Sequence, residues 1–196
     1  MILPIVAYGD PVLRKVGKEI DKDYPNLVTL IANMKETMYN ASGVGLAAPQ
    51  IGKDIRLFVI DASPFAEDEQ LDEKDRETLK SFNKVFINPQ IVEEAGEEWA
   101  FNEGCLSIPD VREDVFRKEK IKIEYFDENF TKHTEELEGL AARVFQHEYD
   151  HIEGVLFTDK LSALKKRLIK KKLDHISKGK IRAEYRMRFP NLKKKR

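Results

Sequence analysis

The stretch that most constrains this chain is QHEYDH, residues 146–151, which contains two of the four histidines. His147 and His151 are four positions apart, so on a helix both imidazoles lie on one face, one turn from each other. Glu148 stands next to the first of them. HExxH on a helix is the arrangement in which two histidines bind a catalytic divalent metal and the glutamate acts as general base. A surface helix with two incidental histidines is the less favoured alternative.

Apolar residues place this stretch within a longer helix. In residues 139–153, Leu140 and Val144 fall on the face of the two histidines, and Gly154 follows as a C-terminal cap. Helical spacing also predicts a helix over 24–41 and a basic helix over 162–177. Their apolar stripes are Leu27, Leu30, Ile31, Met34 and Met38 in the first, and Leu164, Leu168, Leu173 and Ile176 in the second.

Three segments have the composition of strands, namely 55–61, 84–92 and 120–126. Together with the helices they predict an α+β fold. In this fold, mixed or antiparallel strands pack around the central HExxH helix, with an N-terminal helix before them and the basic helix after them.

Length and composition favour one globular domain. A chain of 196 residues can bury a core of its own, and 41% hydrophobic with 35% charged residues is typical of a folded protein with an ionised surface. The opening MILPIVA is too short to span a bilayer and has no basic residues before it, so we expect no signal peptide and no membrane contact. The single cysteine fits a reducing compartment, and we expect a cytoplasmic monomer.

Charge is distributed unevenly along the chain. Residues 160–196 contain 16 Lys and Arg and 2 acidic residues, a net charge of +14, although the whole chain has a net charge of −1. Such a basic segment is either a solvated surface or a binding face for a phosphate-rich partner, and the sequence leaves both readings open.

Two segments are expected to lie outside the catalytic core. Residues 62–83 are acidic and mostly polar, which indicates a surface excursion whose removal would leave the core intact. Residues 166–196, the basic helix and tail, are expected to extend a catalytic domain formed by residues 1–165.

A metal ion bound by two imidazoles needs a third protein ligand, and the residues downstream of His151 do not supply a good one. Peptidases with HExxHxxGxxH place a third histidine where this chain has Phe157, which cannot bind a metal. Glu184 lies among basic residues and is better explained as a counter-ion. Upstream, Cys105 lies in EGCLSIPD, residues 103–110. A thiolate binds Zn²⁺ or Fe²⁺ well, and one Cys with two His leaves a tetrahedral position open for water.

Three stretches together resemble the signature motifs of the peptide deformylases, in order and at plausible spacing: GVGLAAPQ (43–50), EGCLS (103–107) and QHEYDH (146–151). The resemblance covers about residues 4–165. It implies hydrolysis of the N-formyl group from the initiating methionine of nascent polypeptides, with release of formate. It also implies one metal ion per chain, commonly Fe²⁺ with Zn²⁺, Ni²⁺ or Co²⁺ as substitutes, bound by Cys105, His147 and His151.

The resemblance also implies roles for other residues. Glu148 would accept the proton of the attacking water and pass it to the departing amine. The Gln50 side-chain amide and the Leu106 backbone N–H would stabilise the oxyanion. The expected substrate-binding residues are Gly43, Val44, Gly45, Phe101, Glu103, Gly104, Arg112, Leu140, Arg143 and Val144.

Two of these positions leave questions open. Arg143 replaces a residue that is often apolar in the family, so we expect a more polar pocket rim. Glu103 is expected to pair with Arg112 or Arg117, or to contact the peptide backbone, and the sequence does not decide between these.

Two other functions remain open at this point. One is a ribosome- or nucleic-acid-binding module with a structural metal, although structural zinc sites normally have four protein ligands and this chain has no second cysteine. The other is a general HExxH peptidase, which would show no preference for a formyl group. For the deformylase, docking of the basic C-terminal helix on ribosomal RNA is a further expectation.

Overall fold

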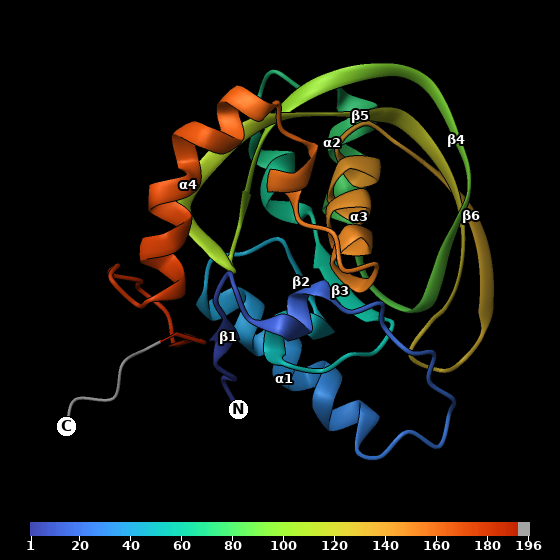
Figure 1. The fold of residues 1–196 in the computed structure, drawn as a ribbon. Helices are drawn as coiled ribbons and strands as arrows, with labels where there is room; N and C mark the ends of the chain where they lie inside the picture. The colour runs from blue at the N-terminus through green and yellow to red at the C-terminus, as the bar shows by residue number, and fades with distance from the viewer. Residues whose placement is uncertain (192–196) are drawn as a thin grey trace.

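The structure, a computed structural model, describes residues 1–191 (Figure 1). These residues form a five-stranded antiparallel sheet, a two-stranded parallel sheet and four α-helices, which confirms the predicted α+β class. The α-helices are α1 (Leu27–Asn40), α2 (Glu73–Lys80), α3 (Gly139–Ile152) and α4 (Ala163–Ser177). Short 3-10 helices are η1 (Pro11–Arg14), η2 (Ala48–Ile51), η3 (Ser63–Glu67) and η4 (Phe157–Lys160).

The larger sheet has the strand order β2-β3-β4-β5-β6. Its strands are β2 (Gly45–Ala47), β3 (Leu57–Asp61), β4 (Asn83–Cys105), β5 (Ile108–Phe126) and β6 (Lys132–Glu138). The predicted strands 84–92 and 120–126 fall within β4 and β5, and the predicted strand 55–61 begins two residues before β3. Strands β4 and β5 continue far beyond the predicted ranges and form one long hairpin, in which Cys105 pairs with Ile108.

Helix α3 lies in the middle of the fold, where β4, β5 and β6 curve around it (Figure 1). Its Phe145 contacts Phe58 and Phe86 of the sheet, with ring centroids 5.1 Å and 5.0 Å away. Ala141 and Ala142 are buried against the same strands. This packing fixes the rotation of α3 about its axis, so that His147 and His151 face Glu103 and Cys105 at the end of β4.

Helix α1 packs against the opposite part of the core. The five apolar residues expected to form its stripe are all buried, together with strand residues Leu57 and Val59. Helix α1 therefore covers a separate apolar cluster from the one that α3 covers.

The apolar seam predicted for the basic helix is wrong at two positions. Leu164 and Leu168 are 66% and 71% exposed, whereas Ile169, Leu173 and Ile176 are buried. These buried residues follow i, i+4, i+7 spacing and pack in one cluster with β5, so α4 is rotated relative to the expected face. The expected domain division after residue 165 falls inside α4. The expected basic tail includes residues 192–196, which lie outside the described residues.

The expectation that residues 62–83 can be removed without effect on the core is also wrong. The segment forms η3 and α2, and its Leu79 and Phe82 are buried in the same apolar cluster as Phe86 and Phe145. The acidic residues of the segment lie on its outward face. The few apolar residues of the segment are spaced so that they reach the core.

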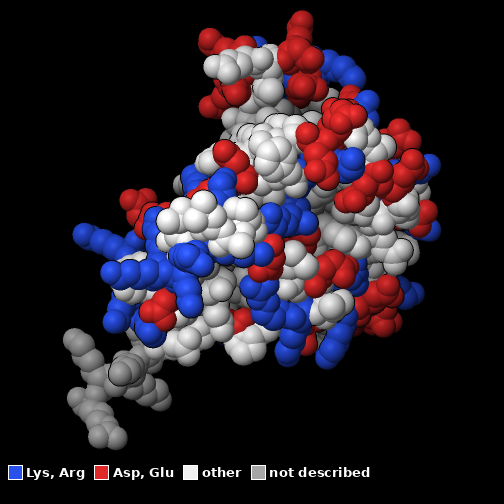
Figure 2. All heavy atoms as spheres, turned by 45° about the horizontal axis from the view of Figure 1, so that its top comes forward, with Lys and Arg blue, Asp and Glu red and all other residues white. Residues whose placement is uncertain are grey.

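Both ends of the described chain meet in the smaller sheet. Strand β1 (Ile5–Val6) pairs in parallel with β7 (Met187–Arg188), and the N-terminal and C-terminal segments lie side by side in Figure 1. Figure 2 shows Lys and Arg gathered near the end of the described chain, and Asp and Glu over another part of the surface. Among the described residues, no helix is both long and apolar enough to cross a membrane.

Candidate metal centre

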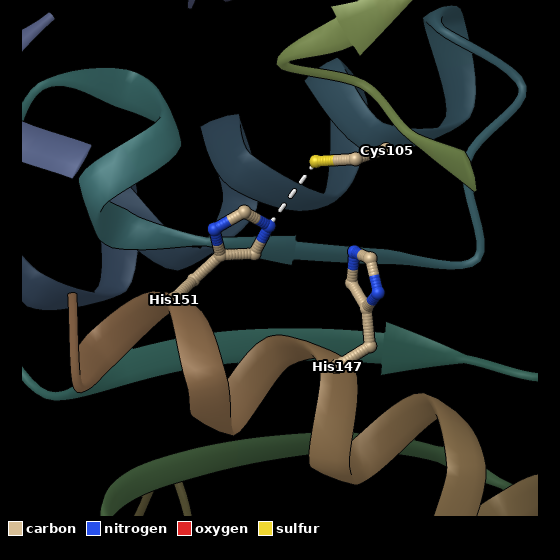
Figure 3. Close-up of side chains that lie close together, drawn as sticks. All are labelled: Cys105, His147 and His151. Carbon is tan, nitrogen blue, oxygen red and sulfur yellow. Dashed lines mark hydrogen bonds between the residues drawn. The ribbon is translucent and has the colours of Figure 1, made fainter. Parts of the chain in front are cut away.

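The last residue of β4 and one face of α3 bring three potential metal ligands together. The ligand atoms of Cys105, His147 and His151 all lie within 4.8 Å of one another. The Sγ of Cys105 is 3.2 Å from Nε2 of His151, and both imidazoles face the thiol (Figure 3). The structure thus assembles the ligand set expected from the sequence. One thiolate and two imidazoles are a suitable donor set for Zn²⁺ or Fe²⁺.

Glu103 orients the first histidine. Its Oε2 lies 2.9 Å from Nδ1 of His147, so the ring donates an N–H there and leaves Nε2 with a free lone pair for a metal. The second ring, His151, is buried, and its Nδ1 has no hydrogen-bond partner among the described residues.

Glu103 is itself held by two buried arginines. Arg117 donates to both carboxylate oxygens at 2.7 Å and 2.9 Å, and Arg143 donates to one of them at 3.0 Å. Burial alone would raise the pKa of Glu103, but hydrogen bonds and charges from His147 and Arg117 outweigh it and hold the pKa well below its usual range. The carboxylate is therefore ionised at neutral pH. Of the two arginines considered from the sequence, Arg117 pairs with Glu103, whereas Arg112 binds Asn102.

Arg143 does not form the polar rim that the sequence suggested. Its side chain is only 2% exposed, and its guanidinium lies 4.3 Å from the ring centroid of Trp99. Besides Glu103, it donates to the carbonyls of Val115 and Trp99. Because those partners engage both of its terminal nitrogens, Nη1 and Nη2, Arg143 supports the wall of the site from behind.

The carboxylate of Glu148 lies beside the ligands and is buried, and its Oε2 has no hydrogen-bond partner among the described residues. Burial raises its pKa to about 7, although the charges of His147 and Arg117 act in the opposite direction. Gly45 lies against this carboxylate so closely that a Cβ atom there would overlap with it. A glycine is required at position 45 if Glu148 is to keep this place.

Gln50 and the turn after Cys105 form another side of the site. The Oε1 of Gln50 accepts from the backbone N–H of Ala47 at 2.8 Å, which directs its NH₂ group outward. That NH₂ lies 3.5 Å from the Sγ of Cys105 and 3.4 Å from the Oγ of Ser107. The side chain of Leu106 covers Gly43, where a Cβ atom would collide with it.

A cleft of about 640 Å³ opens next to these groups. Of the ten expected substrate-binding residues, nine line it, namely Gly43, Val44, Gly45, Phe101, Glu103, Gly104, Arg112, Arg143 and Val144. Leu140 does not. It lines a different cavity of about 470 Å³ beside α2, because it lies one turn nearer the start of α3 and faces Leu71 and Leu137.

Comparison with known proteins identifies the chain. The family model described as polypeptide deformylase matches residues 2–167. The chain belongs to the polypeptide deformylase family. A peptide deformylase of Christiangramia forsetii is 71% identical over 196 residues, which is 100% of both chains, and one of Flavobacterium johnsoniae is 66% identical over the same length.

Solved deformylase structures share the fold. The peptide deformylase from Legionella pneumophila has a TM-score of 0.76 at 39% identity, covering 92% of this chain and 98% of that one. The enzyme from Thermotoga maritima has a TM-score of 0.70 at 41% identity, covering 83% and 99%. These relationships confirm the predicted function: this deformylase is a metal-dependent hydrolase that removes the N-formyl group from newly made polypeptides.

Some residues of the deformylase cleft were not suggested by the sequence. Phe65, which lies in the segment expected to be peripheral, has its ring centroid 6.3 Å from that of Phe101 and lines the cleft. Residues 182–185 line it from the C-terminal side. Neither segment carries a recognisable motif, so only the folded chain reveals that they are near the metal ligands.

Proposed function

We propose that this deformylase binds one divalent metal ion through Cys105, His147 and His151, with Glu148 as the group that moves the proton. The observation that carries the proposal is a buried carboxylate, whose Oε2 has no hydrogen-bond partner in residues 1–191, beside three converging side chains of ligand type. Fe²⁺ is the proposed ion, and Zn²⁺, Ni²⁺ or Co²⁺ would be accepted by the same donors. When bound, such an ion supplies Lewis acidity, which polarises a carbonyl and lowers the pKa of water towards neutrality.

Glu148 would accept a proton from the attacking water and then donate it to the amine that leaves the formyl carbon. A general acid-base group works best when its pKa lies near the working pH. Burial gives Glu148 a pKa of about 7, which suits both steps. Formate and a free N-terminal amine are the products.

The oxyanion would be stabilised by the NH₂ group of Gln50 and the backbone N–H of Leu106. Gln50 is buried and its orientation is fixed by Ala47, so its donor is already directed before substrate binds. Donors arranged in advance stabilise developing charge without reorganisation, and losing one typically costs about 3 kcal/mol.

The methionine side chain would lie in the apolar part of the cleft, between Val44, Phe101 and Val144. The rings of Phe101 and Trp99 are 5.6 Å apart, and Arg143 lies over Trp99, so this wall is held in place by packing. Gly43 and Gly45 line the other side of the cleft, where the absence of Cβ atoms gives room to the side chains of Leu106 and Glu148. Gly104 and Arg112 line the outer part of the cleft, where the following residues of the peptide would pass.

The test is formate release from a formyl-Met peptide by protein prepared without oxygen and loaded with Fe²⁺. Glu148→Ala should keep its metal and lose activity by about 10²- to 10⁴-fold. Cys105→Ala should lose the metal. An acetyl-Met peptide is the control substrate and should not be cleaved. An inactive wild-type protein with iron, nickel and cobalt in turn would refute the proposal.

We further propose that the enzyme acts as a cytoplasmic monomer that docks on the ribosome through α4. The helix exposes Leu164 and Leu168 next to a dense set of lysines, while its other face is fixed to β5. A basic face attracts the phosphate backbone of RNA, and binding then weakens as salt rises.

The docking test must leave the buried face of α4 intact. Lys170→Glu/Lys171→Glu changes two exposed residues of α4, and Lys22→Glu/Lys53→Glu makes the same charge change at exposed positions elsewhere. The α4 variant should bind ribosomes more weakly and with a smaller salt dependence than the wild type, whereas the control should not. Equal affinity of both variants would contradict the docking proposal.

A further inference from the structure

The turn that follows Cys105 is held from three directions. Gln50 reaches Cys105 and Ser107 from η2, as described above. The backbone N–H of Tyr8 donates to the carbonyl of Ser107 at 2.8 Å. The third contact comes from the far end of the chain, where the hydroxyl of Tyr185 donates to the carbonyl of Leu106 at 2.8 Å.

Tyr185 is brought there by the smaller sheet. The N–H groups of Ile5 and Ala7 donate to the carbonyls of Arg186 and Arg188, both at 2.9 Å, so residues 186–188 are fixed along β1. The ring of Tyr185 is partly buried and packs against the same apolar cluster as the side chain of Leu106. Residues 182–185 therefore form a wall of the cleft that is held in place by the smaller sheet.

We propose that Tyr185 is a positioning residue for hydrolysis, which acts by fixing the orientation of Leu106. The inference rests on the proposed role of the Leu106 N–H as an oxyanion donor. Leu106 lies in a two-residue turn, where a small rotation of its backbone would change the direction of its N–H. A phenol that holds its carbonyl restricts that rotation, and the Leu106 side chain is held at the same time by contact with Gly43. A donor fixed in this way is already oriented in the ground state.

The test compares Tyr185→Phe with wild type in the full-length, iron-loaded enzyme. The variant keeps the ring and removes only the donor. We expect kcat for a formyl-Met peptide to fall about 3- to 10-fold, the effect of one lost neutral hydrogen bond, with KM changed less than about 2-fold. Metal content should equal that of the wild type.

Tyr24→Phe is the matched control. The ring of Tyr24 packs against the same apolar cluster, and its hydroxyl makes no hydrogen bond with the described residues. Its kcat should equal that of the wild type. An equal loss in both variants would overturn the inference, because it would indicate general loosening of the cluster.

Three other outcomes would overturn the inference. The first is an unchanged kcat in Tyr185→Phe. The second is a rise in KM alone, which would indicate that Tyr185 contacts the substrate directly. The third is a loss of metal that parallels the loss of rate, which would indicate an effect through Cys105. The proposed function is tested separately by wild-type turnover and by the variant Gln50→Ala. We expect kcat of this variant to fall about 10²- to 10³-fold. A failed inference is thereby distinguished from a failed oxyanion assignment.

Discussion

Glu103 joins the metal centre to the interior of the protein. One oxygen faces His147, and two arginines on the other side neutralise a charge that would otherwise be costly to bury. Arg117 in turn contacts Asp150 at 2.7 Å, so the network returns to the helix that carries the histidines. Ligand orientation and the stability of the core thus depend on the same carboxylate.

Removing that charge should destabilise the fold strongly. Glu103→Gln leaves the buried guanidinium of Arg143 without a counter-ion and leaves Arg117 with Asp150 alone, and we expect a loss of about 3–5 kcal/mol in the free energy of unfolding, measured by urea denaturation of metal-free protein. Glu138→Gln, at a side chain that is 48% exposed and pairs with Lys74, should cost less than about 1 kcal/mol. Similar losses in both variants would show that the buried network contributes no more than a surface pair.

Asp61 should make stability depend on pH in a defined window. Burial alone would raise its pKa, but hydrogen bonds from Ser63 and Tyr39 outweigh it and lower the pKa below the ordinary value of 3.8. Because the folded state prefers the ionised form, the stabilisation is present above the unfolded pKa and is lost as pH falls through the folded value. The difference in unfolding free energy between wild type and Asp61→Asn should be largest from about pH 5 to 7 and shrink below about pH 4. A difference that stays constant across this range would contradict the assignment.

Among the elements, the segment between β3 and β4 has a larger structural role than its composition indicates. Its residues are mostly polar and exposed, yet Ala66, Leu79 and Phe82 complete the cluster that holds α3 against the sheet. Phe65 at the same time extends into the cleft beside Phe101. The segment therefore links the packing of α3 to the shape of the substrate pocket.

Phe82→Ala should accordingly cost about 3–5 kcal/mol in unfolding free energy, because it leaves a cavity beside Phe86. The control is Leu168→Ala on the exposed side of α4, where the effect should stay within about 0.5 kcal/mol. Chemical denaturation of both variants measures the contrast. If Phe82→Ala is as stable as Leu168→Ala, the segment is peripheral after all.

The elements also show which features a sequence can reveal. Helices α1 and α3 were predictable because their apolar residues recur at helical spacing and one face is buried. The parts of β4 and β5 outside the predicted ranges were not. In β4 this part is exposed at most positions and rich in Glu, and in β5 charged residues interrupt the alternation and one of them, Arg117, is buried. In α4, two leucines at helical spacing are exposed, because the lysine-rich sequence offers several possible faces and only packing selects one.

Within the site, the convergence of Cys105, His147 and His151 could be predicted because two short motifs, EGCLS and QHEYDH, carry them, the second with Glu148 beside the first histidine. Leu140 was misplaced since one turn of a helix separates a residue of the cleft from a residue of the neighbouring cavity. Arg143 was expected at the rim of the pocket because a charged side chain usually faces solvent. In the structure its charge is stabilised in the interior by the carboxylate of Glu103 and the ring of Trp99.

At the scale of the whole molecule, residues near both ends of the described chain contact the turn beside the candidate metal centre. Strand β1 ends two residues before Tyr8, and β7 begins two residues after Tyr185, so each strand of the small sheet lies close in sequence to a residue that holds the turn after Cys105. The family match ends at residue 167, and β7 lies beyond it.

Shortening the chain after Gly179 should therefore affect β1 selectively. The amides of Ile5 and Ala7 lose their acceptors in residues 186 and 188, and we expect their hydrogen exchange to accelerate, while the amides of β3 keep their protection. Exchange measured by mass spectrometry on both chains tests this. Unchanged protection at β1 would show that the pairing contributes nothing to its order.

The pairing of β1 with β7 also bears on the order in which the protein is made. Synthesis proceeds from the N-terminus, so residues 185–188 are translated after every residue that they contact. While these residues are still inside the ribosome, the nascent chain already contains α3, the helix with the two histidines. It still lacks one of the three contacts on the turn after Cys105. Tyr185 is thus the last of the three residues holding this turn to be translated, and the turn acquires its third contact only after α3 has been made.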